Sequence, residues 1–150
     1  MAQKNTTIEN KKAYFDYAIQ ETFEAGIVLL GHEVKAVKSG KASIVGSYVK
    51  MYDNEAWLVG AQINPYQEKN TPKEYDPQRN RKLLLAKKEI KMFLGKAKEK
   101  GLTIVPLKLY NKGGKIKVAI ALAKSKKAPD KRETIKKRDV ERELGRRLKR

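Results

Sequence analysis

The sequence contains no cysteine, one histidine and one tryptophan among its 150 residues. The lack of cysteine excludes disulfide bridges, a thiol nucleophile and thiolate metal ligands. One histidine, His32, cannot form a histidine metal cluster or a pair of histidines for acid–base chemistry. There is no glycine-rich phosphate loop either, because Gly113 and Gly114 are better explained as a hairpin turn. We therefore predict that the protein is not an enzyme and needs no metal ion or other cofactor.

Long apolar runs are also missing. The longest strictly apolar run covers residues 118–123, far short of the ~20 residues of a membrane-spanning helix. The first seven residues lack the apolar segment of a signal peptide. From these two absences we expect a cytoplasmic protein with no part in the membrane.

Negative charge is scarce, whereas positive charge is abundant. The chain has 35 Lys and Arg residues against 17 Asp and Glu residues, a formal net charge of +18. Such an excess opposes compact folding by self-repulsion, so we expect a polyanionic partner. Charge alone leaves nucleic acid, an anionic membrane surface and an acidic protein as candidates.

The apolar pattern predicts more strands than helices. Residues 17–26 alternate apolar and polar side chains, as a half-buried strand does, and residues 116–122 show the same alternation. The predicted strands are 17–26, 43–50, 56–63, 102–110 and 115–123. The predicted helical segments are one turn within 10–18, a helix from Leu30 to Val37 that ends at Gly40, and a helix at 84–100 that ends at Gly101. Turns are expected at 53–54 and 111–114, and a loop at 64–78.

This order of elements predicts a β-rich α+β fold, a small β-barrel with attached helices, formed by residues 1–123. The composition changes at Lys124. Residues 124–150 contain thirteen Lys and Arg residues, five Asp and Glu residues and four large aliphatic residues. That is too little apolar surface for a core, so we predict a tail that is disordered when free and becomes helical on a partner.

The tail could bind either a membrane or an RNA. A membrane is disfavoured because the tail has no aromatic residue for the interface. RNA is favoured, because Lys and Arg neutralise phosphates whatever the base sequence. Tyr14, Tyr48 and Tyr110 lie near cations and could stack on unpaired bases. The alternative for each tyrosine is a core ring with its hydroxyl at the surface.

Six short motifs, in order along nearly the whole chain, resemble the SsrA-binding protein family, also called small protein B. They are Phe-Glu-Ala-Gly-Ile at 23–27, Gly-His-Glu-Val-Lys at 31–35, Ser-Gly-Lys-Ala at 39–42, Ser-Tyr-Val at 47–49, Asp-Pro at 76–77 with Arg-Asn-Arg-Lys-Leu-Leu-Leu at 79–85, and Asp-Lys-Arg at 130–132. The resemblance implies an oligonucleotide-binding-like β-barrel with about three flanking helices and a basic C-terminal tail. It also implies a monomer that binds the tRNA-like domain of transfer-messenger RNA and brings it to stalled bacterial ribosomes for trans-translation. The alternative is a general RNA chaperone or a ribosomal-type RNA-binding protein.

Matched position by position, the resemblance implies an RNA-contacting surface on the body. Its residues are Asn10, Lys11, Glu24, Lys35, Lys38, Lys41, Arg81, Lys82 and Leu84. From the pattern alone, Glu24 is better explained as a solvated strand residue and Leu84 as a helix core residue. The three lysines at 35, 38 and 41 are equally well explained as a solvated face.

The resemblance further implies that the tail enters the messenger channel of the small ribosomal subunit, beginning near the decoding centre. The matching residues are Lys124, Lys126, Lys127, Asp130, Lys131, Arg132, Ile135 and Lys136. Two positions depart from the family pattern: Pro129 and Val140 stand where many relatives have an aromatic residue or, before Asp-Lys-Arg, a histidine. Stacking from these positions is unavailable here, so electrostatic and backbone contacts have to replace it.

Overall fold

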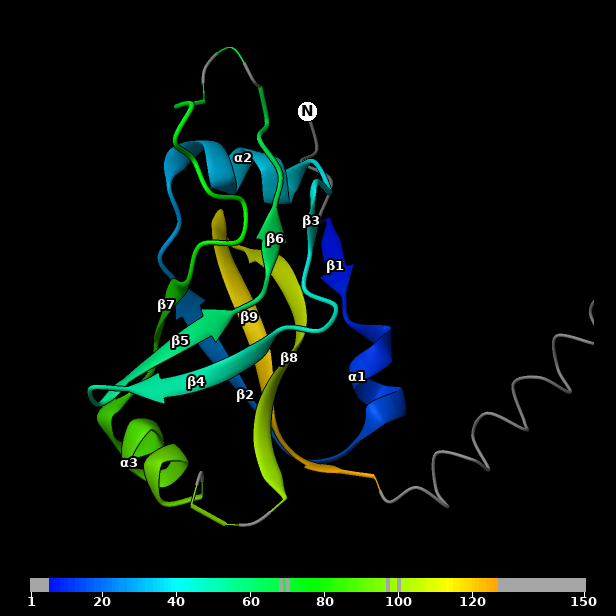
Figure 1. Cartoon of the computed structure of the whole chain (residues 1–150), viewed down its shortest axis with the longest axis vertical. Coiled ribbons are helices and arrows are strands. Elements are labelled where there is room, and N and C mark those ends of the chain that lie inside the picture. The colour runs from blue at the N-terminus through cyan, green and yellow to red at the C-terminus, as the bar shows by residue number, and fades with distance from the viewer. Residues whose placement is uncertain (1–5, 68, 70, 97, 100, 127–150) are drawn as a thin grey trace, which may run out of the picture.

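The computed structural model describes residues 6–67, 69, 71–96, 98–99 and 101–126. Within these residues nine strands and three helices follow one another along the chain (Figure 1). The helices are α1 (Lys11–Asp16), α2 (Gly31–Lys38) and α3 (Lys87–Lys96). The strands are β1 (Thr7–Glu9), β2 (Tyr17–Ile27), β3 (Ala42–Ser43), β4 (Tyr48–Tyr52), β5 (Glu55–Val59), β6 (Gln62–Ile63), β7 (Arg81–Leu84), β8 (Leu102–Lys112) and β9 (Lys115–Ser125). None of the helices described is long and apolar enough to cross a membrane.

Seven strands form one antiparallel sheet in the order β1-β8-β4-β5-β7-β2-β9, and β8 also pairs with β9. Following the pairings from β8 through β4, β5, β7, β2 and β9 therefore leads back to β8. The strands β3 and β6 form a separate two-stranded pair. In Figure 1, α2 lies at one end of the sheet, α3 at the opposite end and α1 at the side. The β-rich α+β prediction with three flanking helices is confirmed for the described residues.

The main core fills the space between the strands and α3. Leu58, Leu83, Val118 and Ile120 are almost fully buried there. Phe93 of α3 is buried too, and its ring meets the edge of the Phe23 ring at 4.8 Å between centroids. A second, smaller cluster covers the outer side of β8 and β9. In it Ala13 of α1 packs with Val105, Leu107, Ala121 and Ala123.

Local backbone requirements explain the turns. Asp53 and Asn54 have φ values of +50° and +59°, as a two-residue hairpin turn of the primed type needs, and they join β4 to β5 where the sequence predicted a turn. The two strands predicted at 43–50 and 56–63 are each divided. Gly46 (φ +79°) separates β3 from β4, and Gly60 (φ +85°) separates β5 from β6. Both predicted strands were therefore too long.

Two further boundaries differ from the prediction. The helix predicted at 84–100 begins only at Lys87, because residues 81–84 pair with β5 and β2 as strand β7. Leu84 is thus a strand residue and not part of a helix core. The last strand, β9, runs to Ser125, where Ser125 pairs with Tyr17 and Lys124 with Ala18. Lys124 and Ser125 therefore belong to the folded body, and the tail predicted from residue 124 can begin only after them.

Candidate nucleic-acid interface

One outer surface of the sheet is built by matching residues on four neighbouring strands. Gly26 of β2 pairs with Leu84 of β7 on one side and with Lys117 of β9 on the other, and Lys117 pairs with Tyr110 of β8. Cross-strand partners point to the same side of a sheet. A second row, two residues away, joins Glu24, Ala119 and Lys108. We call this surface the Glu24 face, defined by Glu24, Gly26, Leu84, Lys108, Tyr110, Lys112 and Lys117.

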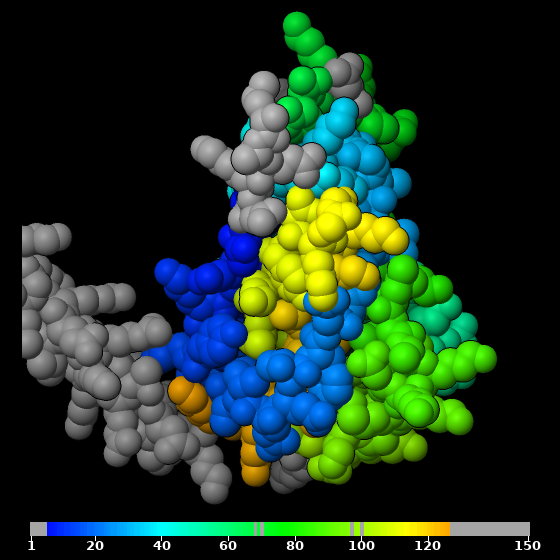
Figure 2. Space-filling model, turned by 180° about the vertical axis from the view of Figure 1, so that it is seen from behind, coloured from blue at the N-terminus to red at the C-terminus, as the bar shows by residue number. Residues whose placement is uncertain are grey.

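Figure 2 views the molecule from behind and shows this side, where the blue of β2 meets the yellow of the β8–β9 hairpin. The strand register explains why its residues face outward. Their neighbours along the strands, such as Ala25, Leu83 and Val118, are buried in the main core. The alternation of a strand then places the residues between them on the outside.

At the centre of the face, Glu24 accepts a hydrogen bond from the Tyr110 hydroxyl and from Lys112 Nζ, which lies 3.2 Å from Oε1. The small side chain of Ala119, which pairs with Glu24 on the intervening strand, leaves room for this contact between β8 and β2. The hydrogen bonds from Tyr110 and Lys112 and the nearby Lys112 and Lys117 charges lower the pKa of Glu24. Glu24 is therefore a carboxylate at neutral pH, able to accept from base amino groups or ribose hydroxyls.

The pKa of Tyr110, the hydrogen-bond partner of Glu24, shifts in the opposite direction. Burial raises the pKa of Tyr110, and the hydrogen bond to Glu24 and its charge add to this effect, so that the pKa reaches about 12. Tyr110 thus remains a neutral phenol that donates to Glu24. Lys108 Nζ lies 5.3 Å from the centre of the Tyr110 ring. The face therefore combines an acceptor, an aromatic ring and lysine charges within a few residues.

Leu84 provides an apolar part of the same face. Its side chain is 54% exposed. A Cβ placed on Gly26 would lie only 3.2 Å from Leu84 Cβ, so the glycine makes room for Leu84 beside β2. An exposed leucine packed against a backbone is suited to van der Waals contact with a ribose or a base.

The other predicted RNA-contacting residues lie in different places. Lys11 is exposed on α1. Lys35 and Lys38 lie on α2 and Lys41 follows it, with Lys41 Nζ 5.6 Å from the centre of the Tyr66 ring. Lys82 pairs with Glu55 at 3.0 Å. The structure thus brings Glu24 and Leu84 together on one face and spreads the lysines over at least two others.

Two of the predicted residues, Asn10 and Arg81, are buried in the body and do not lie on its open surface. Asn10 is 3% exposed; its side chain accepts from Ala13 N at the start of α1 and donates to Pro106 O at 2.9 Å. Arg81 is fully buried, and its guanidinium donates to Glu33 and to backbone oxygens. Both positions therefore hold the body together, because all their polar groups that point inward already have partners.

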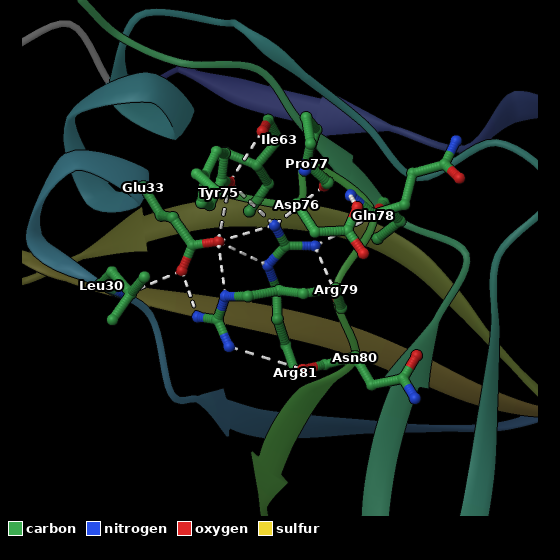
Figure 3. A network of polar contacts seen from close by, with 11 residues as sticks. Leu30, Glu33, Ile63, Tyr75, Asp76, Pro77, Gln78, Arg79, Asn80 and Arg81 are labelled. Carbon is green, nitrogen blue, oxygen red and sulfur yellow. Dashed lines mark hydrogen bonds and ion pairs between the residues drawn. The ribbon is translucent and has the colours of Figure 1, made fainter. Parts of the chain in front are cut away.

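A buried polar network around Glu33 was not predicted from the sequence (Figure 3). Glu33 of α2 accepts from Arg81 Nε at 2.9 Å, from Arg79 Nε at 3.1 Å and from the Tyr75 hydroxyl at 2.9 Å. It also accepts from the backbone N–H of Leu30 at 2.8 Å, which caps the first turn of α2. The network therefore joins the start of α2 to the loop at residues 64–80.

The charges in this network stay ionised. Burial by itself raises the pKa of Glu33, but hydrogen bonds from Arg79, Leu30 and Arg81 together with the Arg81 charge outweigh it and lower the pKa to about 2. Burial and the Glu33 carboxylate also raise the pKa of Tyr75. A sequence signal for this network did exist. Arg81 alternates with the apolar Leu83 on a short strand, and an arginine on an inward-facing position needs a buried carboxylate.

The tail residues divide at the limit of the described chain. Lys124 is exposed on β9, and Lys126 N donates to Asp16 O at 3.1 Å. Lys127, Asp130, Lys131, Arg132, Ile135 and Lys136 lie outside the described residues. Among the residues that are described, no group of three or more His, Cys, Asp or Glu side chains is placed to hold a metal ion.

Comparisons with known proteins identify what this chain resembles. The model of a family described as SmpB protein matches residues 7–150. A relative from Thermosynechococcus vestitus named SsrA-binding protein is 47% identical over 141 residues, which cover 94% of this chain and 93% of the relative. Another SsrA-binding protein, from Burkholderia vietnamiensis, is 52% identical over 139 residues, which cover 93% and 94%. A solved structure described as "tmRNA-SmpB: a journey to the center of the bacterial ribosome" matches with a TM-score of 0.69 and 44% identity over 86% of this chain and 94% of that chain.

Proposed function

The chain belongs to the SmpB protein family, and from this premise we propose that it binds the tRNA-like domain of transfer-messenger RNA and delivers it to stalled bacterial ribosomes for trans-translation. It is an RNA-binding protein of the ribosome rescue pathway, with transfer-messenger RNA and the ribosome as partners. Its work on the ribosome would place it in the cytoplasm. The proposal includes no catalytic step.

The observation that best supports the site is the ionised Glu24 beside an exposed Leu84 on one face. RNA stems and elbows are recognised by shape, ribose hydroxyls and stacked bases more than by base sequence. The Glu24 carboxylate, held by Tyr110 and Lys112, accepts hydrogen bonds from hydroxyl and amino groups. A phosphate has no such donor and cannot bind to it in this way. Glu24 therefore selects for ribose and base groups, while Lys108 and Lys117 on the same face attract the phosphates. Lys11 and the lysines around α2 would add charge at a distance.

We interpret the cycle of strand pairings as an oligonucleotide-binding-like barrel. The pairing of β8 with both β4 and β9 supports this interpretation, because it leaves none of the six strands in the cycle with a free edge along its whole length. A closed sheet of this size is stiff enough to hold Glu24 and Leu84 in fixed relative positions. Precise positions are what recognition of an RNA shape requires.

For the tail we propose a separate role in the messenger channel near the decoding centre. Its high density of Lys and Arg supports an rRNA-lined site. The residues proposed for it are Lys126, Lys127, Lys131, Arg132 and Lys136 as charge contacts, with Asp130 and Ile135 in the helix that forms there. Lys124, as part of β9, would fix where the tail leaves the body.

A binding assay tests the recognition surface. Full-length protein is titrated with the isolated tRNA-like domain and with an RNA hairpin of equal size at one moderate salt concentration. We expect Leu84→Ala and Glu24→Gln each to weaken binding to the tRNA-like domain by about tenfold, a loss of ~1.4 kcal/mol. Equal affinity of the unmodified protein for both RNAs would instead support a general RNA chaperone or a ribosomal-type protein.

Matched controls separate the site from general surface effects. Val45→Ala shortens another exposed aliphatic side chain, 50% exposed against 54% for Leu84. Glu55→Gln removes one negative charge from an ion pair on β5. Neither should change the affinity for the tRNA-like domain more than about twofold, as expected for surface changes away from an interface.

A further inference from the structure

A second outer surface, on β4, β5 and β7, has aromatic rings among cations. On β4 the residues Tyr48, Lys50 and Tyr52 alternate with the inward-facing Val49 and Met51. Lys50 pairs with Trp57 of β5, and Trp57 pairs with Lys82 of β7. We call this surface the aromatic face, defined by Tyr48, Lys50, Tyr52, Trp57 and Lys82. Its β4 and β5 residues lie away from the Glu24 face, because β4 and β5 are at the front of Figure 1 whereas β2 passes behind them. The two faces adjoin only on β7, where Lys82 and Leu84 point outward two residues apart.

The aromatic residues of this face are open to an incoming ligand. Tyr52 is 68% exposed and Tyr48 is 43% exposed. Burial of an aromatic ring lowers the free energy of a folded protein, so two exposed rings on one face are notable. A hollow of about 360 Å³ opens beside Tyr52, lined by Lys50, Tyr52, Trp57, Val59 and Asn80. This hollow has an aromatic wall on β4 and another on β5.

Trp57 supplies a second, independent observation. Its indole nitrogen is buried and has no hydrogen-bond acceptor among the described residues. A buried donor without an acceptor raises the free energy of the folded protein. Trp57 lines the hollow, so a shift of the indole toward it would let a ligand oxygen or ring nitrogen remove that cost. Nucleobases carry such acceptors at their edges and a flat ring for stacking.

The charges select among the possible ligands. Lys50 and Lys82 flank the Trp57 ring across the strands, and the one carboxylate of β5, Glu55, is already paired with Lys82 at 3.0 Å. The whole chain has a net charge of +18. A flat, uncharged ligand would contact the rings but not the lysines. A folded duplex would contact the lysines but hides its base faces from the rings. Unpaired bases on a phosphate backbone contact both the rings and the lysines.

From these observations we propose that the aromatic face of β4 and β5 is a second RNA site, which stacks unpaired bases of a single-stranded segment against Tyr52 and Trp57. The lysines at positions 50 and 82 contact the flanking phosphates. The site is independent of the Glu24 face, and it gives the body two RNA contacts of different kinds: a folded RNA shape on one side and a single strand on the other.

Trp57 is the only tryptophan in the chain, so its fluorescence reports on this face alone. The full-length protein is titrated with hexanucleotides of uridine and of adenosine, and in parallel with inorganic polyphosphate, which has charge but no bases. We expect saturable quenching of Trp57 by the hexanucleotides and weaker binding of polyphosphate without quenching. Tyr52→Ala should raise the dissociation constant for the hexanucleotides about 5- to 100-fold, the effect of losing one stacked base.

Two variants make the result specific. Tyr52→Phe keeps the ring and should bind within about threefold of the unmodified protein. Tyr14→Ala removes another exposed tyrosine, 54% exposed and on α1, and should leave the quenching unchanged. Because Tyr52 is mostly exposed, its replacement should leave the circular dichroism spectrum and the midpoint of urea unfolding unchanged.

Four outcomes would overturn the proposal. The first is hexanucleotide binding without a change in Trp57 fluorescence, and the second is equal quenching by polyphosphate. The third is a concentration-dependent dimer, seen by sedimentation, that Tyr52→Ala dissociates, because the aromatic face would then bind a second copy of the chain.

The result is separable from the function proposed above: Leu84→Ala should keep the quenching, and Tyr52→Ala should keep the affinity for the tRNA-like domain. If both variants lose the same binding, the two faces are one site and the inference fails.

Discussion

At the scale of single residues, one carboxylate makes two arginines compatible with the interior of the body. Glu33 and Arg81 have no exposed side-chain surface, and Arg79 approaches from the partly exposed side. Burying one charge alone would cost several kcal/mol, and the contacts from both guanidinium groups, Tyr75 and the Leu30 N–H offset that cost. The network therefore has a structural role: it positions α2 and the loop at residues 64–80.

Removing the charge from Glu33 should expose how much the network contributes. We expect Glu33→Gln to lower the free energy of unfolding by about 3–5 kcal/mol, since Arg81 is left buried without a counter-charge. Urea unfolding followed by circular dichroism measures this difference. Glu55→Gln breaks the exposed Lys82–Glu55 pair and should cost less than about 1 kcal/mol. Equal losses in the two variants would contradict the structural role of Glu33.

The contact between Glu24 and Tyr110 makes a prediction about titration. Burial, and after it the hydrogen bond to Glu24 and the Glu24 charge, raise the pKa of Tyr110 to about 12 from its usual 10. The neutral phenol therefore contributes stability that is fully present below pH 10 and is lost as the pH rises through 12. We expect Glu24→Gln to lower the pKa of Tyr110 toward 10, leaving only the effect of burial. A titration of ¹³C-labelled tyrosine by NMR measures it. Glu21→Gln, on the same strand, serves as the control and should leave the Tyr110 pKa unchanged.

At the scale of elements, the packing of β2 against β7 sets the position of Leu84. Gly26→Ala places a Cβ about 3.2 Å from Leu84 Cβ, so Leu84 must move by a few tenths of an ångström. We expect the tRNA-like domain to bind two- to tenfold more weakly, an effect of less than ~1.4 kcal/mol, while the fold is retained. Methyl NMR shifts of Leu84 report the displacement. A displaced Leu84 with unchanged affinity would show that its position is not read by the RNA.

A matched glycine offers the control. Gly95 lies in α3, and a Cβ there meets nothing within 4 Å. Gly95→Ala should raise the free energy of unfolding by about 0.5–1 kcal/mol through helix propensity and should not alter RNA affinity.

Elements were predictable where the pattern of side chains is local. The alternation of Ile116, Val118, Ile120 and Leu122 with smaller or charged residues predicted β9, and the Asp53-Asn54 pair predicted the hairpin turn. The prediction that Leu84 belongs to a helix was wrong because residues 83–85 are all leucines, and a short apolar run is compatible with a helix or a strand. Only pairing with β2 and β5, which are distant in sequence, selects the strand.

The candidate site was predictable only in part for a related reason. Glu24 and Leu84 came from family motifs, and the strand register then placed both on one face. Arg81 belongs to the same motif as Leu84, and Asn10 was matched by position, but their burial depends on partners at Glu33 and Pro106, many residues away. A motif shows that a residue matters for the family. It does not show whether the residue faces the RNA or the core.

At the scale of the whole molecule, acid should unfold the body at a pH set largely by Glu33. Its pKa of about 2 lies below the usual 4.5, so the stability from this shift is present above pH 4.5 and is lost as the pH falls toward 2. The shift corresponds to on the order of 3 kcal/mol. Protonation also increases the net positive charge, so added salt should protect the fold by screening. Urea midpoints at several pH values test this, and Glu33→Gln should show a flatter dependence between pH 4.5 and 2.

The division of labour between body and tail is tested by a deletion that respects the end of β9. Residues 124 and 125 are paired with β2, and Lys126 N is bonded to Asp16 O, so a cut at 124 would damage the sheet. Deleting residues 127–150 instead removes eleven of the thirteen tail cations, leaves Lys124 and Lys126 in place and does not touch the described body. We expect the dissociation constant for the tRNA-like domain to stay within about threefold of the full-length value at moderate salt. At low salt, where long-range charge acts, the loss of affinity should be larger. No tagging on stalled ribosomes should occur in a reconstituted assay. Loss of binding to the isolated tRNA-like domain would assign recognition to the tail, whereas retained tagging would exclude it from the messenger channel.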